Sequence, residues 1–153
     1  MKEVVDLGLP SGTLWCKYNL GCNYNLLNEH PEETKPEDWY GDYYAWGETE
    51  SNKSKYTSTS YKWNNKHITT RYNSTDNFKE LIPEDDAAQQ FNKMLKIPNV
   101  DECLELLNNT HIECIYNYNN INGLNGYLII NRKDKSKYIF IPASGIMSGS
   151  KRI

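Results

Sequence analysis

Three consecutive acids, Glu84, Asp85 and Asp86, form the longest run of oxygen ligands in the sequence. Such carboxylates bind calcium or magnesium when several of them converge from a shaped loop. Adjacent acids at the start of a helix point in different directions instead, and Pro83 stands where the first helical residue would be. The helix dipole favours acids in that turn. We therefore interpret the run as a helix start and expect no metal site.

Nucleophilic and zinc chemistry lack the residue spacings that they need. No two cysteines form a CxxC pair, and the histidines are scattered. The segment ASGIMSG, residues 143–149, lacks the GxSxG order of a nucleophile elbow. The residues concerned are Cys16, Cys22, Cys103, Cys114, His30, His67 and His111. We expect no catalytic residue, no cofactor and no enzyme; the cysteines are expected to be free thiols, with a Cys103–Cys114 disulfide as the alternative.

The segment PEDWYGDYYAWGETE, residues 36–50, concentrates aromatic side chains among acids and two glycines. Its rings are Trp39, Tyr40, Tyr43, Tyr44 and Trp46. The composition fits an aromatic ligand platform, an acidic metal site or an unusual core element. Residues 40–46 are expected to form a short aromatic strand or an extended segment.

Residues 50–80, here called the excursion, are rich in Ser, Thr, Asn, Lys and Tyr and show little periodicity. A long irregular segment inside a compact domain is usually functional or mobile. Its tyrosines and tryptophan are Tyr56, Tyr61, Trp63 and Tyr72. Aromatic rings supply contact area at a low entropy cost, so these four are the candidate binding residues. The alternative is a mobile loop whose rings are tucked onto the core.

The bulk composition excludes several classes of protein. The chain has 153 residues, the size of one domain, and a net charge of -3, with no basic stripe for nucleic acid. The cluster Arg132, Lys133, Lys135 and Lys137 is expected to be a solvated hairpin turn. No apolar run is long enough to insert into a membrane. The N-terminal residues lack the apolar region of a signal peptide, which predicts that the protein stays inside the cell or leaves it without secretion.

Hydrophobic periodicity predicts an α+β fold with antiparallel strands and two short helices. The expected strands are 3–9, 13–20, 111–119, 126–131 and 137–142. The expected helices are about 83–95 and 100–108. Residues 21–38 are expected to be a polar loop. In the second strand Leu14, Cys16 and Tyr18 should share one face, opposite Trp15 and Lys17. In the helices, the apolar faces should be Ala87, Ala88, Phe91, Met94 and Leu95, and Cys103, Leu104 and Leu107.

Five sequence blocks occur in one order along nearly the whole chain. They are VDLGLPSGTLW (5–15), YGDYYAWGET (40–49), PEDDAA (83–88), IPNVDECLELL (97–107) and NGYLI…IFIPASG (125–145). Together they resemble the domain family named for a major paralogous domain of Fibrobacter succinogenes, which is abundant in Bacteroidetes and their phages. The chain departs from this family at QQFNKMLKIP (89–98), which lacks the family's Trp-Gly-Gly.

The resemblance implies a single C-type-lectin-like domain over 1–153, of the type found in formylglycine-generating enzymes. It implies that the 40–49 segment is fold-defining, with rings in the core. It also implies a surface-exposed, non-enzymatic module. We expect a virion component of a Bacteroides-infecting phage, such as a head or tail fibre or a decoration protein, that binds a protein partner or a cell-surface glycan. The alternative is an adhesin or lectin-like domain at the bacterial surface or outside the cell; a formylglycine-generating enzyme is the least favoured.

The family continues beyond the last matched block with further strands, whereas this chain stops at Ile153. The fold is therefore expected to be incomplete at its C-terminus. Ile139, Phe140, Ile141 and Ile146 should then lack cover, and the open strand edges should favour self-association or a partner protein.

Overall fold

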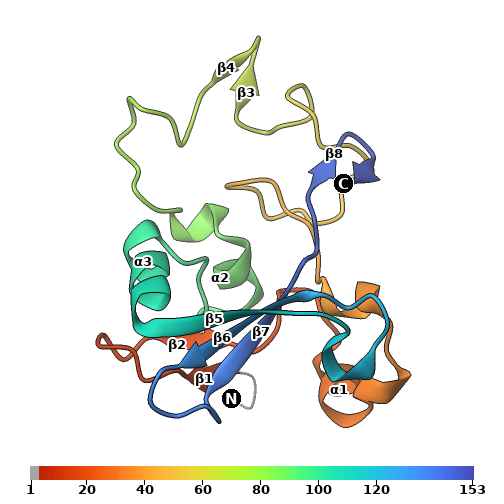
Figure 1. The fold of residues 1–153 in the computed structure, drawn as a ribbon. Coiled ribbons are helices and arrows are strands. Elements are labelled where there is room, and N and C mark those ends of the chain that lie inside the picture. Colours follow the sequence, from red (N-terminus) through yellow and green to blue (C-terminus); the bar gives the residue numbers. More distant parts are fainter. Residues whose placement is uncertain (1–3) are drawn as a thin grey trace. The chain divides into compact units, whose positions relative to one another are not determined.

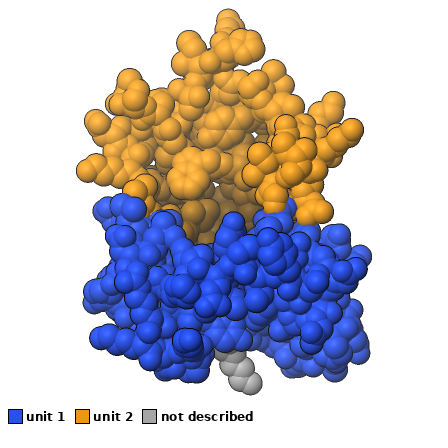
Figure 2. All heavy atoms as spheres, in the orientation of Figure 1, with its two compact units in different colours: residues 1–42, 101–144 blue, residues 43–100, 145–153 orange. Residues whose placement is uncertain are grey.

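The computed structural model describes residues 4–153, which form two compact units, each built from two stretches of chain (Figure 2). Unit 1 comprises the residues up to 42 and residues 101–144, and unit 2 comprises residues 43–100 and 145–153. Both contain short helical segments or turns and antiparallel strand pairs (Figure 1). The expected α+β class is confirmed.

Unit 1 holds the one three-stranded sheet among the described residues, and unit 2 holds two-stranded pairs. The elements around unit 1 are β1 (Val4–Asp6), β2 (Leu14–Cys16), α1 (Tyr24–Glu29), η1 (Pro31–Glu33), η2 (Pro36–Trp39), α3 (Val100–Asn109), β5 (Thr110–Ile115), η4 (Tyr118–Asn120), β6 (Gly126–Asn131) and β7 (Tyr138–Pro142). The elements of unit 2 are β3 (Asn64–Asn65), β4 (Ile68–Thr69), η3 (Pro83–Asp85), α2 (Ala87–Phe91), β8 (Met147–Ser148) and β9 (Lys151–Arg152).

The antiparallel meander β5-β6-β7 was predicted and is present (Figure 1). Its last turn contains the basic cluster, as expected. There the side-chain oxygen of Asn131 accepts hydrogen bonds from the backbone N–H groups of Lys133 and Asp134, both at 2.7 Å. The asparagine thus closes the turn locally, and the lysines need no ligand to explain them.

Two hydrophobic clusters lie on opposite faces of this sheet. In register, Ile129 pairs with Ile139 on one face, and Leu128 pairs with Phe140 on the other. The first face carries Leu7, Leu9, Leu106, Ile129 and Ile139. The second carries Cys22, Leu27, Trp39, Ile121, Leu124 and Phe140. The sheet is thereby buried on both faces in its centre, and it organises unit 1.

The N-terminal hairpin has the predicted alternation but is shorter than predicted. Strands β1 and β2 pair antiparallel, with Val5 opposite Trp15. Trp15 packs against the cluster around Leu7, whereas Leu14 and Cys16 are exposed. The predicted opposition of Trp15 to Leu14 and Cys16 is therefore correct.

The polar loop predicted at 21–38 is wrong, because this segment is largely helical. It forms α1, η1 and η2 in succession. Asn23 caps α1, and its side chain accepts from the backbone N–H of Leu26 at 3.2 Å. Leu27 and Trp39 are buried from these short turns. The high Asn and Glu content concealed two apolar residues that anchor the segment to the core.

The helix predicted at 83–95 is broken after its first turn. Pro83 does begin a helical turn, but Asp86 leaves it with extended backbone and becomes the N-cap of α2. The Asp86 side chain accepts from the backbone N–H groups of Ala88 and Gln89, and also from that of Ile97. Phe91 and Met94, expected on a buried face, are exposed because α2 ends at Phe91.

Helix α3 is present where it was predicted, but its buried face is different. Leu106 is the buried residue, while Leu104 and Leu107 are half exposed. The predicted stripe of Cys103, Leu104 and Leu107 is therefore wrong. The pattern was ambiguous because Leu104, Leu106 and Leu107 fall on adjacent faces of one short helix.

The prediction that four apolar residues near the chain end lack cover is wrong for two of them. Ile139 and Phe140 are buried, one in each cluster of unit 1. Ile141 and Ile146 are exposed. Segments 21–38 and 118–124, which the prediction left out of the core, supply the cover of Phe140.

None of the four cysteines forms a disulfide, so the alternative bridge between Cys103 and Cys114 is absent. Burial raises the pKa of the Cys22 thiol to about 11, whereas Cys16 and Cys114 are exposed. Because the thiolate is the reactive form, iodoacetamide at pH 8 should modify Cys16 and Cys114 rapidly and Cys22 slowly. Mass spectrometry of peptides from the native chain reads the three rates, and denatured chain is the control. Equal rates at Cys22 and Cys16 in the native chain contradict this placement.

Candidate functional site

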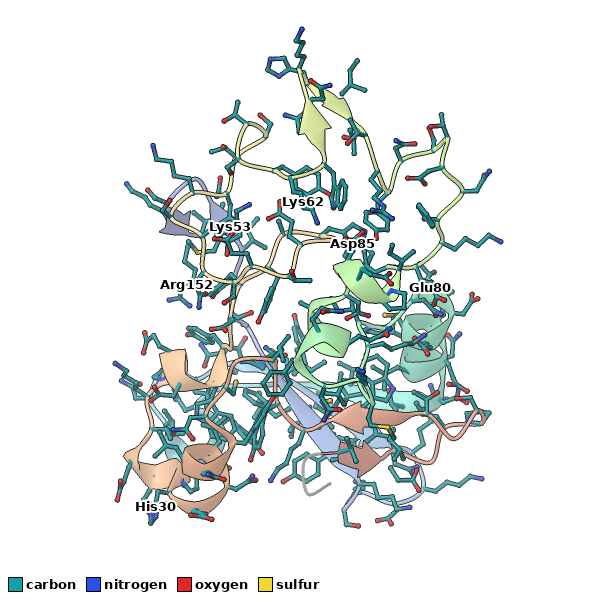
Figure 3. The ribbon with its side chains drawn as sticks, turned by 180° about the vertical axis from the view of Figure 1, so that it is seen from behind. His30, Lys53, Lys62, Glu80, Asp85 and Arg152 are labelled. Atoms are coloured by element: carbon teal, nitrogen blue, oxygen red, sulfur yellow. The ribbon has the colours of Figure 1, made fainter. Side chains whose placement is uncertain are left out.

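The best-organised polar cluster of unit 2 surrounds Asp85, a buried residue at the end of η3 (Figure 3). One carboxylate oxygen lies 3.4 Å from Lys62 Nζ. The other accepts from the Tyr72 hydroxyl at 2.7 Å and lies 3.1 Å from Arg71 Nη1. Asp85 therefore joins three side chains of the excursion to η3. We call Asp85, Lys62, Arg71 and Tyr72 the Asp85 cluster.

Tyr72 is held in its neutral form within this cluster. Desolvation, together with the hydrogen bond to Asp85, raises the pKa of the Tyr72 hydroxyl to about 12. The Tyr72 hydroxyl therefore keeps its proton over the physiological pH range and donates a hydrogen bond to the Asp85 carboxylate. A phenol bound in this way positions its ring and is not available as a general base.

A second buried acid, Glu48, anchors the beginning of the excursion. It forms an ion pair with Lys53, and its other oxygen accepts from the backbone N–H of Lys62 at 2.7 Å. Lys53 Nζ also donates to the carbonyl of Ser60 at 2.9 Å. Both oxygens of Glu48 are thus used to fix the course of the chain between residues 53 and 62.

Cations cover the rings of the excursion near the Asp85 cluster. The Arg71 guanidinium lies 4.7 Å from the centre of the Trp63 ring and 5.4 Å from that of Phe78. Lys62 Nζ lies 4.3 Å from the Trp63 ring. Trp63 also donates from Nε1 to the Gly47 carbonyl at 2.8 Å. The ring faces of Trp63 are therefore engaged inside unit 2.

The other two predicted rings line a hollow of about 290 Å³, close to the lower limit of roughly 300 Å³ for small-molecule sites. Its lining is Ala45, Glu48, Lys53, Tyr56, Thr57, Ser58, Ser60 and Tyr61. The Tyr56 hydroxyl donates to the Tyr43 carbonyl, and the Tyr61 hydroxyl donates to the Trp46 carbonyl at 2.9 Å. Both rings are thereby fixed by their polar ends. We call this hollow the Tyr56–Tyr61 pocket.

The structure thus separates the four candidate binding residues into two pairs. Tyr56 and Tyr61 line the pocket, whereas the rings of Trp63 and Tyr72 lie against the Arg71 guanidinium. All four rings are half-buried. Sequence reasoning did not identify Glu48 and Asp85 as the buried acids that fix the surrounding chain, because their lysine and arginine partners lie in a segment without periodicity.

The aromatic segment 36–50 is divided between the two units. Trp39 is 4% exposed and belongs to the core of unit 1, whereas Trp46 is 50% exposed. Of the two expectations for residues 40–46, the strand is not formed, because the one bridge there pairs Tyr44 with Ser51. Gly41 and Gly47 both have positive φ and turn the chain away from a strand.

Gly47 is packed so closely that alanine should not fit. Its φ is 72°, and an added Cβ would lie 2.5 Å from the Tyr72 ring. Gly47→Ala should lower the free energy of unfolding of unit 2 by more than the about 1–2 kcal/mol that the left-handed backbone alone costs, because the added Cβ also clashes with the Tyr72 ring. Urea denaturation followed by circular dichroism measures the loss. Gly12→Ala is the matched control, because φ there is 77° and no atom lies within 4 Å of the added Cβ. Equal losses in both variants contradict the close packing at Gly47.

One group of possible metal ligands occurs among the described residues, at His30, Glu32 and Glu33 (Figure 3). All three are exposed, and His30 Nδ1 lies 3.8 Å and 3.9 Å from the two carboxylates. Exposed acidic groups of this kind are common without a metal ion. Among the described residues, no helix combines the length and the apolar character needed to cross a membrane.

The acids Glu84, Asp85 and Asp86 do not converge on one point. Glu84 is exposed, Asp85 joins the excursion, and Asp86 caps α2. Each of the two buried acids therefore has a separate structural partner.

No family model, no curated protein and no solved structure matches this chain.

Proposed function

We propose that this chain is a non-enzymatic interaction module with a C-type-lectin-like fold, which binds a cell-surface glycan at the Tyr56–Tyr61 pocket. The observation that carries the proposal is the composition of that pocket. Two fixed tyrosine rings lie beside the hydroxyl residues Thr57, Ser58 and Ser60. A sugar ring presents C–H groups to an aromatic face and hydroxyls to polar side chains, so it matches both features.

Preorganisation of the pocket supports the proposal. The Glu48–Lys53 ion pair lies in its lining, and Lys53 and Ser60 are joined by a hydrogen bond. A pocket that is already ordered loses less entropy on binding than a mobile loop does. A non-enzymatic role is supported by the same contacts, since the Glu48 carboxylate is committed to Lys53 and to a backbone N–H and is not free to act as a base.

The test is binding of labelled chain to an array of capsular and outer-membrane glycans from Bacteroides. Ser58→Trp fills the pocket at an exposed residue whose hydroxyl makes no hydrogen bond in the structure. Ser54→Trp adds the same ring outside the pocket. The wild type and Ser54→Trp should bind the same glycans, and Ser58→Trp should bind at least about tenfold more weakly. An array with no bound glycan, or equal binding by Ser58→Trp, overturns the proposal.

We propose further that the module belongs to the virion of a Bacteroides-infecting phage. The resemblance of the blocks at 5–15, 40–49 and 125–145 to a domain family of Bacteroidetes and their phages supports this context. Genes for head and tail proteins beside the coding sequence are the expected result. A secretion leader in the native coding sequence, with bacterial surface genes nearby, favours the bacterial adhesin instead.

A further inference from the structure

Unit 1 contains a second and larger pocket, with a volume of about 430 Å³, which lies within the size range of small-molecule sites. Its lining comes from β1, from the residues after β2, and from α1, η1, η2, η4 and β7 with its preceding turn. The lining residues that carry the argument are Lys17, Tyr18, Asn28, Trp39, Ile139 and Phe140. We call it the Lys17 pocket.

Half of this lining is apolar and rigid. Leu27, Trp39, Ile139 and Phe140 are buried core residues. The Trp39 ring centre lies 6.0 Å from that of Phe140 and 5.7 Å from that of Tyr18, in edge-to-face contacts. Because these rings pack against one another, the apolar wall is set before any ligand arrives. It suits a flat hydrophobic body.

The other half of the lining presents hydrogen-bond donors. The Asn28 side-chain oxygen accepts from Lys17 Nζ at 2.9 Å and from the Tyr18 hydroxyl at 2.8 Å. With its oxygen occupied by two donors, Asn28 has its NH₂ group left to donate. The Lys17 ammonium likewise retains two hydrogens. Lys17 and Asn28 therefore form a small group of hydrogen-bonded, solvent-exposed donors beside the apolar wall.

The charge of the pocket is positive. Lys17 is the one charged residue of the lining, and no carboxylate among the described residues forms an ion pair with it. Lys137, next to the lining residue Ser136, lies 3.9 Å from Asp6 and is partly neutralised by it. Burial and a hydrogen bond to Tyr138 raise the pKa of the Tyr118 hydroxyl, so this phenol adds no negative charge.

We propose that the Lys17 pocket binds a small carboxylate with an aromatic body, whose carboxylate contacts Lys17 and Asn28 and whose ring packs on the apolar wall. A cation and an amide N–H suit a carboxylate, and an apolar wall suits a ring without hydroxyls. This site is independent of the Tyr56–Tyr61 pocket, because the two have no lining residue in common. Either proposal can fail without the other.

The experiment is calorimetric titration of the full chain with para-hydroxyphenylacetate and indoleacetate. Tyrosol tests the carboxylate, because it keeps the phenol ring and replaces the acid with an alcohol. Glucuronate tests the aromatic body, because it keeps the acid on a hydroxyl-rich ring. At least one aromatic acid should bind, and tyrosol and glucuronate should each bind about tenfold more weakly than that acid or not at all.

Two variants and a map of the contacted residues test the location. Lys17→Gln should weaken binding of the aromatic acid about tenfold, whereas Lys133→Gln, an equal change of charge at an exposed residue outside the pocket, should leave it unchanged. In amide NMR spectra of the wild type, the shifted signals should include Asn28, Asn119 and Ser136. Failure of both acids to bind, equal binding of tyrosol or glucuronate, or shifts centred on Tyr56 and Tyr61 overturns the proposal.

Discussion

Replacing Trp39 with alanine should lower the free energy of unfolding by about 3–5 kcal/mol, the usual cost of removing a large buried ring. Trp39 is 4% exposed and packs against Phe140 and Tyr18 in the core of unit 1. Its Nε1 donates to the Thr34 hydroxyl at 2.8 Å. The variant leaves a cavity between η2 and β7 and a buried hydroxyl without its donor. Chemical denaturation followed by far-ultraviolet circular dichroism measures the loss.

The matched control for Trp39 is Trp46, seven residues further along the same aromatic segment. Trp46 is 50% exposed. The hydrogen bond that it accepts from Tyr61 goes to its backbone carbonyl, which the alanine variant keeps. Trp46→Ala should therefore cost less than about 1 kcal/mol, as most surface substitutions do. If the two variants lose the same free energy, or if Trp46→Ala loses more, the division of the segment into a core residue and a surface residue is wrong.

Replacing Asp85 with alanine should destabilise unit 2 by about 3 kcal/mol. Removing one partner of a buried charge network usually costs about 3–5 kcal/mol, because it leaves the remaining charges uncompensated. The estimate is at the lower end because Lys62 is half exposed and can turn to solvent. Arg71, 28% exposed, and the Tyr72 hydroxyl lose their common partner. Thermal and urea denaturation of the variant measure the effect.

Glu84→Ala and Asp85→Asn provide controls for that result. Glu84 is the exposed neighbour of Asp85 in the same run of acids, so Glu84→Ala should change the stability by less than about 0.5 kcal/mol. Asp85→Asn keeps one oxygen as an acceptor for Tyr72 and should fall between the two alanine variants. A stability of Asp85→Ala equal to that of Glu84→Ala means that the cluster does not hold the excursion.

The sequence predicted the elements whose patterns are local and repeated. The meander of β5, β6 and β7 follows alternating apolar runs separated by turn residues, and α3 follows a run of apolar residues at helical spacing. The turns 21–38 were missed because Leu27 and Trp39 are isolated among polar residues. Short 3-10 turns gain their stability from such single buried contacts, which leave no periodicity to detect.

The candidate site was predicted only in part, for a related reason. Composition identified Tyr56, Tyr61, Trp63 and Tyr72, because they are the tyrosines and tryptophan of an otherwise polar segment. Composition did not separate Tyr56 and Tyr61, which line the pocket, from Trp63 and Tyr72, which lie against Arg71. That separation depends on ion pairs and hydrogen bonds between residues 5 to 23 positions apart, such as Glu48 with Lys53 and Lys62 with Asp85. Such pairings follow from the folded chain and not from spacing.

The Tyr56–Tyr61 pocket exists only if the excursion is held in one conformation that brings its rings and hydroxyls together. Amide hydrogen exchange measured by NMR tests this most directly. The N–H groups of Tyr56, Lys62 and Thr70 donate to Gly149, Glu48 and Trp63 at 2.7 Å each. They should exchange at least about a hundredfold more slowly than in an unstructured peptide, and more slowly than the exposed Lys66 and His67. Exchange at the unstructured rate for all five amides contradicts the account.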